Sequence, residues 1–234
     1  MSHDTRIRNG IATSSVVVFV VREGNPEGIE NWDDLVEKNL DIITPNPASS
    51  GSAKWNILAA WGHVIAGGGS EDDAKAFVKK LLQNAIALPG SAREATTAFA
   101  EGNGDVLLSY ENEAILARQG GESFDYVVPE DTLLIENPAA VTTDAADGAQ
   151  AFLDYLPTPE AQAVYAGFGF RPIVDGVTLP EVEGANDPAD PFPAPATLLT
   201  IDEDFDGWAE ANTKFFDEDG GIIPQLQAET GTAE

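Results

Sequence analysis

The sequence has 234 residues, of which 43% are hydrophobic and 22% are charged, which is typical of a folded soluble protein and excludes a disordered or collagen-like chain. Its 12 lysines and arginines stand against 40 aspartates and glutamates, and the formal charge of −28 excludes nucleic acid and anionic membranes as general partners. The absence of cysteine excludes disulfides, thiolate metal sites and cysteine nucleophiles.

Strand and helix signals alternate from the start of the chain. A run of β-branched and aromatic residues predicts a first strand that is buried on both faces. Asn31, followed by acidic residues, predicts the start of a helix, and Ser70 with Asp73 matches a capping box that begins another. In chain order the predicted elements are a strand at 14–21, a helix at 31–36, a strand at 40–44, and helices at 52–65 and 71–84.

The alternation continues beyond residue 84. In chain order we predict a strand at 86–88, a helix at 93–101, a strand at 106–108, a helix at 113–118, a strand at 126–129, and helices at 145–156, 159–165 and 201–216. A stretch rich in Pro, Asp and Gly at 179–195 predicts a long surface loop, and the last helix is followed by a polar tail. This order of elements predicts an α/β fold with mostly parallel strands, and the length fits one large domain or two smaller lobes.

The strongest candidate for a binding site is the segment at 46–55, which lies between a predicted strand and a predicted helix. At such a junction the first N–H groups of the helix have no partner within the helix, and the helix dipole adds partial positive charge. Gly51 would let the backbone approach a ligand closely, and Ser49, Ser50 and Ser52 supply hydroxyl donors. The pattern indicates an anion site, while spacing alone leaves an ordinary serine-capped helix start open.

Two further segments follow predicted strand ends. Residues 89–93 form a Gly/Ser turn before a helix, so a second helix N-terminus could converge on the same ligand, with a routine connection as the alternative. Tyr110, Glu111 and Glu113 lie where α/β proteins place ligand contacts. The two glutamates fit a catalytic acid pair poorly, because no partner stands at a recognisable spacing.

Signals for a metal or cofactor are weak. Residues 202–207 match the first half of an EF-hand loop, but Thr213 stands where the last glutamate ligand is needed, so we predict a capped helix start instead. His3 and His63 are too scattered for a metal cluster or a Ser-His-Asp arrangement, and His63 is predicted on a helix surface. The sequence predicts neither a metal site nor a cofactor.

Short stretches spread over the chain resemble, in the same order, the sulfate-binding proteins of ABC importers. Each stretch is short, and their combination is what makes the resemblance specific. The stretches are TSSV at 13–16, VVREGNP at 20–26, WDDL at 32–35, TPNP at 44–47, WNILAAWG at 55–62, GDVLL at 104–108, ENEA at 111–114, RP at 171–172 and TIDE at 200–203. The chain resembles the later two-thirds of that family, and the opening part of the family has no counterpart in it.

The resemblance implies a type II periplasmic binding protein fold, in which two α/β lobes joined by a hinge close on a dehydrated oxyanion. Residues 21–134 would form the middle lobe, and residues 1–20 and 135–234 would form part of an incomplete outer lobe. The implied function is to bind sulfate or thiosulfate and to deliver it to the membrane permease of an ABC importer, as a monomer without enzymatic activity. The implied location is periplasmic or extracellular, although the polar start of the chain shows no signal peptide.

By position, the resemblance also implies that uncharged donors hold the oxyanion. Ser50, Gly51 and Ser52 would supply backbone and hydroxyl donors, Ala92 would supply a backbone N–H, and Tyr110 would replace a ring N–H. The family usually has glycine at the position of Ser52 and tryptophan at that of Tyr110, so a hydroxyl is added and an indole becomes a phenol. Because the contacts from the first lobe have no counterpart, we expect this chain alone to bind sulfate poorly.

Three alternatives remain open at the level of the sequence. Molybdate or phosphate could use the same donors, and hydrogen phosphate would need a carboxylate acceptor such as Glu111 or Glu113. A hydrolase that combines Ser50 with one of these glutamates belongs to a different class, and no base lies at a recognisable spacing for it. The third alternative is a non-functional remnant or an interaction module.

Overall fold

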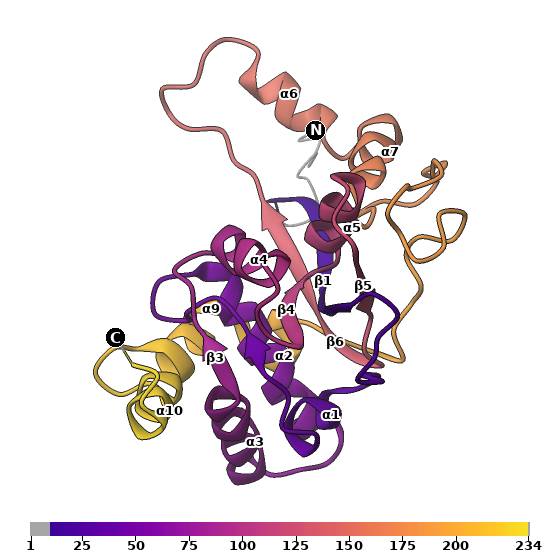
Figure 1. Cartoon of the computed structure of the whole chain (residues 1–234). Coiled ribbons are helices and arrows are strands. Elements are labelled where there is room, and N and C mark those ends of the chain that lie inside the picture. Colours follow the sequence, from indigo (N-terminus) through magenta and orange to yellow (C-terminus); the bar gives the residue numbers. More distant parts are fainter. Residues whose placement is uncertain (1–9, 234) are drawn as a thin grey trace.

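A computed structural model gives the structure of residues 10–233, in which helices cover both faces of one mixed sheet (Figure 1). His3 and residues 1–9 lie outside the described residues, and with them most of the stretch that bears on a signal peptide and the first part of the predicted outer lobe. Among the described residues, none of the helices combines the length and the apolar character that crossing a bilayer needs.

Strand β1 (Ile11–Arg22) runs through the middle of the sheet and contains the strand predicted at 14–21. Along its first half it pairs antiparallel with β6 (Asp131–Pro138). Along its second half it pairs antiparallel with β4 (Val106–Tyr110) and with β5 (Phe124–Val127). These neighbours explain why a long apolar run forms this strand, since both of its edges are hydrogen-bonded and both of its faces are covered.

The sheet has the strand order β3-β2-β4-β1-β6-β7, with β5 also paired to β1. The remaining strands are β2 (Ile42–Ile43), β3 (Ala85–Ala87) and β7 (Thr197–Leu199). β2 is parallel to β3 and to β4, and β6 is parallel to β7, whereas β1 is antiparallel to all three of its partners. The prediction of mostly parallel strands is therefore corrected to a mixed sheet, because the central strand runs against its neighbours.

The helices of the first two-thirds of the chain begin close to the predicted positions. They are α1 (Trp32–Glu37), α2 (Gly51–Ala66), α3 (Glu71–Gln83), α4 (Ala92–Ala100), α5 (Glu111–Gln119), α6 (Ala149–Tyr155) and α7 (Pro159–Gly167). The predicted capping box at the start of α3 is confirmed, because Ser70 and Asp73 bond each other's backbone N–H groups. Asn31 forms a second capping box at the start of α1.

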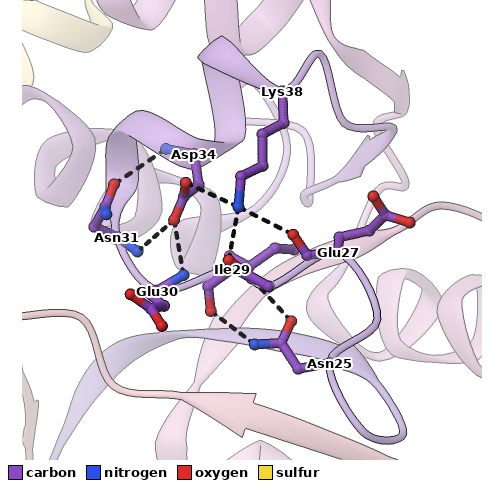
Figure 2. Close-up of polar contacts among 8 residues, drawn as sticks. Asn25, Glu27, Ile29, Glu30, Asn31, Asp34 and Lys38 are labelled. Atoms are coloured by element: carbon purple, nitrogen blue, oxygen red, sulfur yellow. Dashed lines mark hydrogen bonds and ion pairs between the residues drawn. The ribbon is translucent and has the colours of Figure 1, made fainter.

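The connection between β1 and α1 is held by side chains that bond its own backbone (Figure 2). The amide of Asn25, a residue with φ of 47°, donates to the carbonyl of Ile29 and accepts from its N–H. The Lys38 ammonium donates to the carbonyl of Glu27 at 3.0 Å and lies 3.0 Å from Asp34 Oδ1. Burial alone would raise the pKa of Asp34. Hydrogen bonds from backbone N–H groups and from Lys38 outweigh burial and hold that pKa below its ordinary value.

Alternate residues of β1 enter two separate apolar clusters on opposite faces of the sheet. Val17 and Phe19 pack with residues of α1, α2, α3 and the C-terminal helices. Val18 and Val20 pack with residues of α4 and α5 and with Val182. The period of two along a strand therefore makes β1 part of both cores.

The C-terminal region differs from its prediction. The single helix expected at 201–216 is divided into α8 (Ile201–Asp204), α9 (Gly207–Ala211) and the π-helical turn η2 (Asn212–Phe216). The division falls at Asp206, whose left-handed φ of 57° interrupts a helix. The expected polar tail instead contains α10 (Ile222–Thr230), which buries Ile223 and Leu226 and packs against α3.

The segment predicted as a surface loop at 179–195 contains neither a helix nor a strand among the described residues. It is not wholly on the surface, because Val182 and Ala185 are buried in the second apolar cluster. The division into a middle lobe at 21–134 and an outer lobe stays a prediction, and α8 to α10 share the first apolar cluster with α2 and α3.

Candidate anion-binding site

Three helices begin at one edge of the sheet, where the adjacent parallel strands β3, β2 and β4 end. Each strand leads into a helix, so the N-termini of α4, α2 and α5 gather at that edge. Ser50 is the N-cap of α2, with Gly51 and Ser52 in its first turn, Ala92 is the first residue of α4, and Tyr110 is the N-cap of α5. The structure thus brings the five predicted site residues to the ends of three neighbouring strands.

The start of α2 differs from a serine-capped helix. Ser50 has the extended backbone of an N-cap, but no described N–H of the first turn donates to its side chain. Its hydroxyl lies 2.8 Å from that of Ser52 instead. In contrast, the caps Ser70 and Ser91 accept bonds from the first turns of α3 and α4. The capping alternative is therefore wrong for Ser50, and the first amides of α2 remain available to another acceptor.

Gly51 lies in open space at this helix start. No described atom comes within 4 Å of the position that a Cβ would take there. The protein's own packing therefore does not require glycine, and close approach of a ligand to Gly51 stays a prediction. Its exposed backbone faces outward at the positive end of a helix of 16 residues.

The loops before α2 and α4 are bonded to each other. The N–H of Asn46 donates to the carbonyl of Pro89 at 2.8 Å, and the hydroxyl of Ser49 donates to the carbonyl of Gly90 at 3.3 Å. These bonds fix the second predicted segment, and with it Ala92, beside the first. They join residues that lie 41 to 43 positions apart in the chain, which spacing alone did not predict.

Tyr110 joins the sheet to the third helix start. Its backbone pairs with Val17 in β1 and forms the N-cap of α5. Burial, reinforced by the negative charge of Glu113, raises the pKa of the Tyr110 phenol above its ordinary value. The hydroxyl therefore stays protonated and able to donate a hydrogen bond.

Glu111 is a structural residue rather than a catalytic acid or a ligand acceptor. It is fully buried, and its two carboxylate oxygens accept from Arg171 Nε at 2.6 Å and Nη2 at 2.8 Å. Arg171 also exchanges hydrogen bonds with Ser14 of β1. Burial raises the pKa of Glu111, and the guanidinium opposes that rise. Glu111 and Glu113 were the two glutamates considered for the hydrolase and phosphate alternatives. The pairing with Arg171 excludes Glu111 from both roles.

A cavity of about 540 Å³ adjoins the start of α2. Ser50 and Gly51 line it, whereas Ser52, Ala92 and Tyr110 are not among its lining residues. The opposite walls come from the end of β6 and from α9 and η2. Side chains that the sequence analysis did not single out line it as well, namely Lys54, Glu136, Asn137, Trp208 and Asn212.

Contacts with the C-terminal region support this first turn of α2. Lys54 donates to Asn212 Oδ1 at 2.8 Å, and its ammonium lies 4.9 Å from the ring centre of Phe216. Trp55 meets Trp208 edge to face, with ring centres 4.7 Å apart. Lys54 thus places a positive charge beside the cavity, in a chain that has few such charges.

The segment that resembles half of an EF-hand loop and the histidine of α2 both have structural roles. Thr200 caps α8 by accepting from the N–H of Glu203 at 3.1 Å, and Asp204 accepts from the N–H of Thr200 at 2.7 Å. Within residues 10–233 no group of three or more acidic, histidine or cysteine side chains is placed to hold a metal ion. His63 lies on α2 and is half-buried rather than fully on the surface, because its ring is held 3.0 Å from Asp131 and stacks on Trp32.

Several known proteins are similar to this chain in sequence and in fold. The sequence pattern of the family described as bacterial extracellular solute-binding protein matches residues 8–171. A sulfate-binding protein of Synechococcus elongatus is 43% identical, over 94% of this chain and 62% of its own length. A thiosulfate-binding protein of Pseudomonas aeruginosa is 35% identical, over 95% of this chain and 67% of its own length. The chain therefore spans less than two-thirds of the Synechococcus protein.

A solved structure gives the same result. The sulfate-binding protein SubI of Mycobacterium tuberculosis is 44% identical, and the match covers 89% of this chain and 71% of that one with a TM-score of 0.79. The predicted α/β fold of solute-binding proteins and the resemblance to sulfate-binding proteins are both confirmed.

Proposed function

The chain belongs to the bacterial extracellular solute-binding protein family, and on that premise we propose that it binds sulfate or thiosulfate for delivery to the permease of an ABC importer. In this proposal the chain works outside the cytoplasmic membrane, as a monomer, and performs no chemistry on its ligand. The relatives that carry the support are named for binding sulfate or thiosulfate.

The observation that carries the proposal is the uncapped start of α2. A doubly charged oxyanion needs several donors in a small space, and the amides of Gly51 and Ser52 with the paired hydroxyls of Ser50 and Ser52 supply them. The neighbouring start of α4 adds the backbone N–H of Ala92. The donors carry no formal charge, so binding relies on fixed dipoles within a chain of formal charge −28.

Two positions adapt the site relative to the usual pattern of the family. Ser52, where glycine is usual, brings a hydroxyl whose partner is Ser50 at 2.8 Å, so the pair can direct one proton toward an oxyanion. Tyr110, where tryptophan is usual, offers a phenol kept neutral by burial. We propose both as donors to the ligand.

The donors favour a fully deprotonated oxyanion over hydrogen phosphate. Hydrogen phosphate carries a proton that needs an acceptor, and Glu111 is occupied by Arg171. Two carboxylates are left to the phosphate alternative. Glu113 is half-buried and accepts from the amide of Asn112 at 3.1 Å, and Glu136 lines the cavity beside the start of α2. If neither accepts a proton from the ligand, phosphate should compete poorly for bound sulfate at both about pH 6 and about pH 8, and effective competition at either pH would favour the alternative.

The main test is calorimetric titration of sulfate into the chain and into Gly51→Asp. An aspartate in the first turn suits the helix dipole and meets open space, so the fold should be unaffected while the added charge repels the anion. We expect sulfate binding to fall at least about tenfold. The matched control is Gln150→Asp, which adds the same charge to the first turn of the exposed α6 and should leave binding unchanged.

The expectation of poor affinity in this chain alone needs its own comparison. The same titration is repeated on a version extended at its amino end by the corresponding segment of the Synechococcus elongatus protein. Tighter binding by the extended version, with the same sensitivity to Gly51→Asp, supports the proposal and the predicted two-lobed site. If neither version binds sulfate or thiosulfate, the proposed function is wrong.

A further inference from the structure

A second cavity, of about 340 Å³, lies at the other end of α2. Its walls come from the last turns of α2, the start of α3, β7 and the segment from α8 to η2. The floor is apolar and well packed, since Trp61, Phe205 and Phe215 are 3%, 7% and 2% exposed. The volume lies in the range of small-molecule pockets, and the aromatic floor suits an apolar or cationic group.

The electrostatics of this cavity favour a cation. Glu71, Asp204, Asp206 and Glu210 line it against the single positive charge of Lys214. The last carbonyls of α2 add the negative end of a helix of 16 residues. All four acids are exposed, so they surround the mouth rather than the floor.

Lys214 shows that the aromatic rings can receive an ammonium group. Its Nζ lies 5.9 Å from the ring centre of Trp61 and 5.3 Å from that of Phe215, and it is 2.5 Å from Glu71 Oε1. The Lys214 side chain is 45% exposed and that of Glu71 is 56% exposed. An ion pair this exposed contributes little to stability, so the lysine can move aside at small cost.

The segment that carries Lys214 also has an unusual backbone. Lys214 and Phe215 lie in the π-helical turn η2, which follows α9 directly. Single π-helical turns are rare and occur often at functional sites, because the extra residue redirects side chains. Here both of these residues line the cavity, with Lys214 Nζ above the ring of Phe215.

From these observations we propose that the cavity between α2 and η2 binds a small organic cation, namely an ammonium group carried on an apolar body. In this proposal the ammonium group lies over the faces of the aromatic rings, and the acidic residues at the mouth supply the countercharge. The ammonium of Lys214 competes with the ligand for the same position. The proposal does not depend on anion binding at the other end of α2.

The test uses choline as the probe and its uncharged carbon isostere, 3,3-dimethylbutan-1-ol, as the control ligand, both titrated calorimetrically into the full chain. We expect choline to bind and the isostere to bind at least about tenfold more weakly, because only the charge differs. The double variant Asp206→Asn with Glu210→Gln should weaken choline binding about fivefold. Asparagine tolerates the left-handed backbone of Asp206, so this variant should fold normally.

Lys214→Gln should have the opposite effect. Removing the internal cation frees the rings and Glu71, so choline affinity should rise about threefold. The matched charge control for the double variant of Asp206 and Glu210 is Glu101→Gln with Glu122→Gln. It also removes two exposed acids, but these lie outside the cavity, so binding should be unchanged.

Equal binding of choline and the isostere would mean that the cavity recognises apolar shape, and the proposal would be wrong. It would equally be wrong if choline failed to bind the parent chain and the Lys214→Gln variant. If choline affinity fell as much in the Glu101/Glu122 control as in the Asp206/Glu210 variant, the net charge of the chain and not the acids of the cavity would control binding. The proposal would then be wrong as well.

Discussion

The two ends of helix α2 carry opposite electrostatic arrangements. At its amino end, uncapped amides and the ammonium of Lys54 adjoin one cavity. At its carboxyl end, four acids and one lysine surround an aromatic floor. Both ends belong to a chain of formal charge −28, so the mean charge does not decide which ion each end favours. The orientation of the helix and a few nearby side chains decide it.

The largest expected effect concerns the buried pair of Glu111 and Arg171 at the start of α5. Arg171→Met leaves the carboxylate of Glu111 buried without its partner, so the free energy of unfolding should fall by about 3–5 kcal/mol in urea denaturation. Burial raises the folded-state pKa of Glu111, and protonation removes the unpaired charge. In the variant no guanidinium opposes the rise, so the pKa of Glu111 in its folded state should lie higher still. The loss should therefore be full only at pH values above the folded-state pKa of the variant, and it should fade as the pH falls towards the unfolded-state pKa.

The control for Arg171→Met is Arg93→Met, which removes an exposed arginine and should change the unfolding free energy by less than about 0.5 kcal/mol. A loss of under about 1 kcal/mol in Arg171→Met would show that the pair does not hold α5 to β1.

The second prediction compares one glycine at each end of α2. A Cβ on Gly62 would come 2.4 Å from Leu199 Cδ1 and 3.3 Å from Phe205 Cζ, whereas a Cβ on Gly51 would meet no described atom within 4 Å. Gly62→Ala should therefore lower the unfolding free energy by about 1–2 kcal/mol, because overpacking outweighs the better helix propensity of alanine. Gly51→Ala should leave it nearly unchanged. The free energy of unfolding of both variants is measured by thermal or urea denaturation. Equal losses in the two variants would contradict the prediction that only Gly62 is tightly packed.

The third prediction concerns donors at the amino end. Tyr110→Phe removes a hydroxyl that burial keeps protonated, so sulfate affinity should fall about tenfold with little loss of stability. The control is Tyr165→Phe in α7, which lies away from the helix starts and should bind as the parent does. Unchanged affinity in Tyr110→Phe would exclude the phenol as a ligand donor.

The smallest expected effect concerns Glu136, which lines the anion cavity with Ser50 and Gly51. Burial, and then the negative charge of Asp202, raise the pKa of Glu136 above its ordinary value. Glu136→Gln should increase sulfate affinity about threefold near neutral pH, because a repelling charge is removed. In the parent chain the same gain should appear as the pH falls through that raised pKa, and it should be absent from Glu136→Gln when both are titrated over a pH series.

The sequence allowed good prediction of elements whose signals are local. The starts of α1 and α3 depend on Asn31 and Ser70, whose bonds reach only three residues along the chain. β6 was not predicted, because its strand character comes from pairing with β1, more than a hundred residues away. The C-terminal region was also misjudged, since the left-handed Asp206 interrupts a pattern that otherwise reads as one helix.

The same distinction applies to the candidate site. Ser50, Gly51 and Ser52 form one local motif between a strand and a helix, which spacing could reveal. The bond from Lys54 to Asn212 joins residues 158 positions apart, and the pair of Glu111 and Arg171 spans 60 positions. No local pattern encodes such contacts, because they exist only once the sheet and the C-terminal helices are in place.

The position of β1 has a consequence for how the molecule opens to solvent. Its residues are shared by the two apolar clusters, and Phe19 to Val21 pair with neighbours on both edges. Neither core can loosen alone while this strand remains in the sheet, so partial opening should leave its amides protected. Amide hydrogen exchange in β1 should therefore be the slowest in the chain and should report the global stability, whereas the exposed α6 should exchange freely.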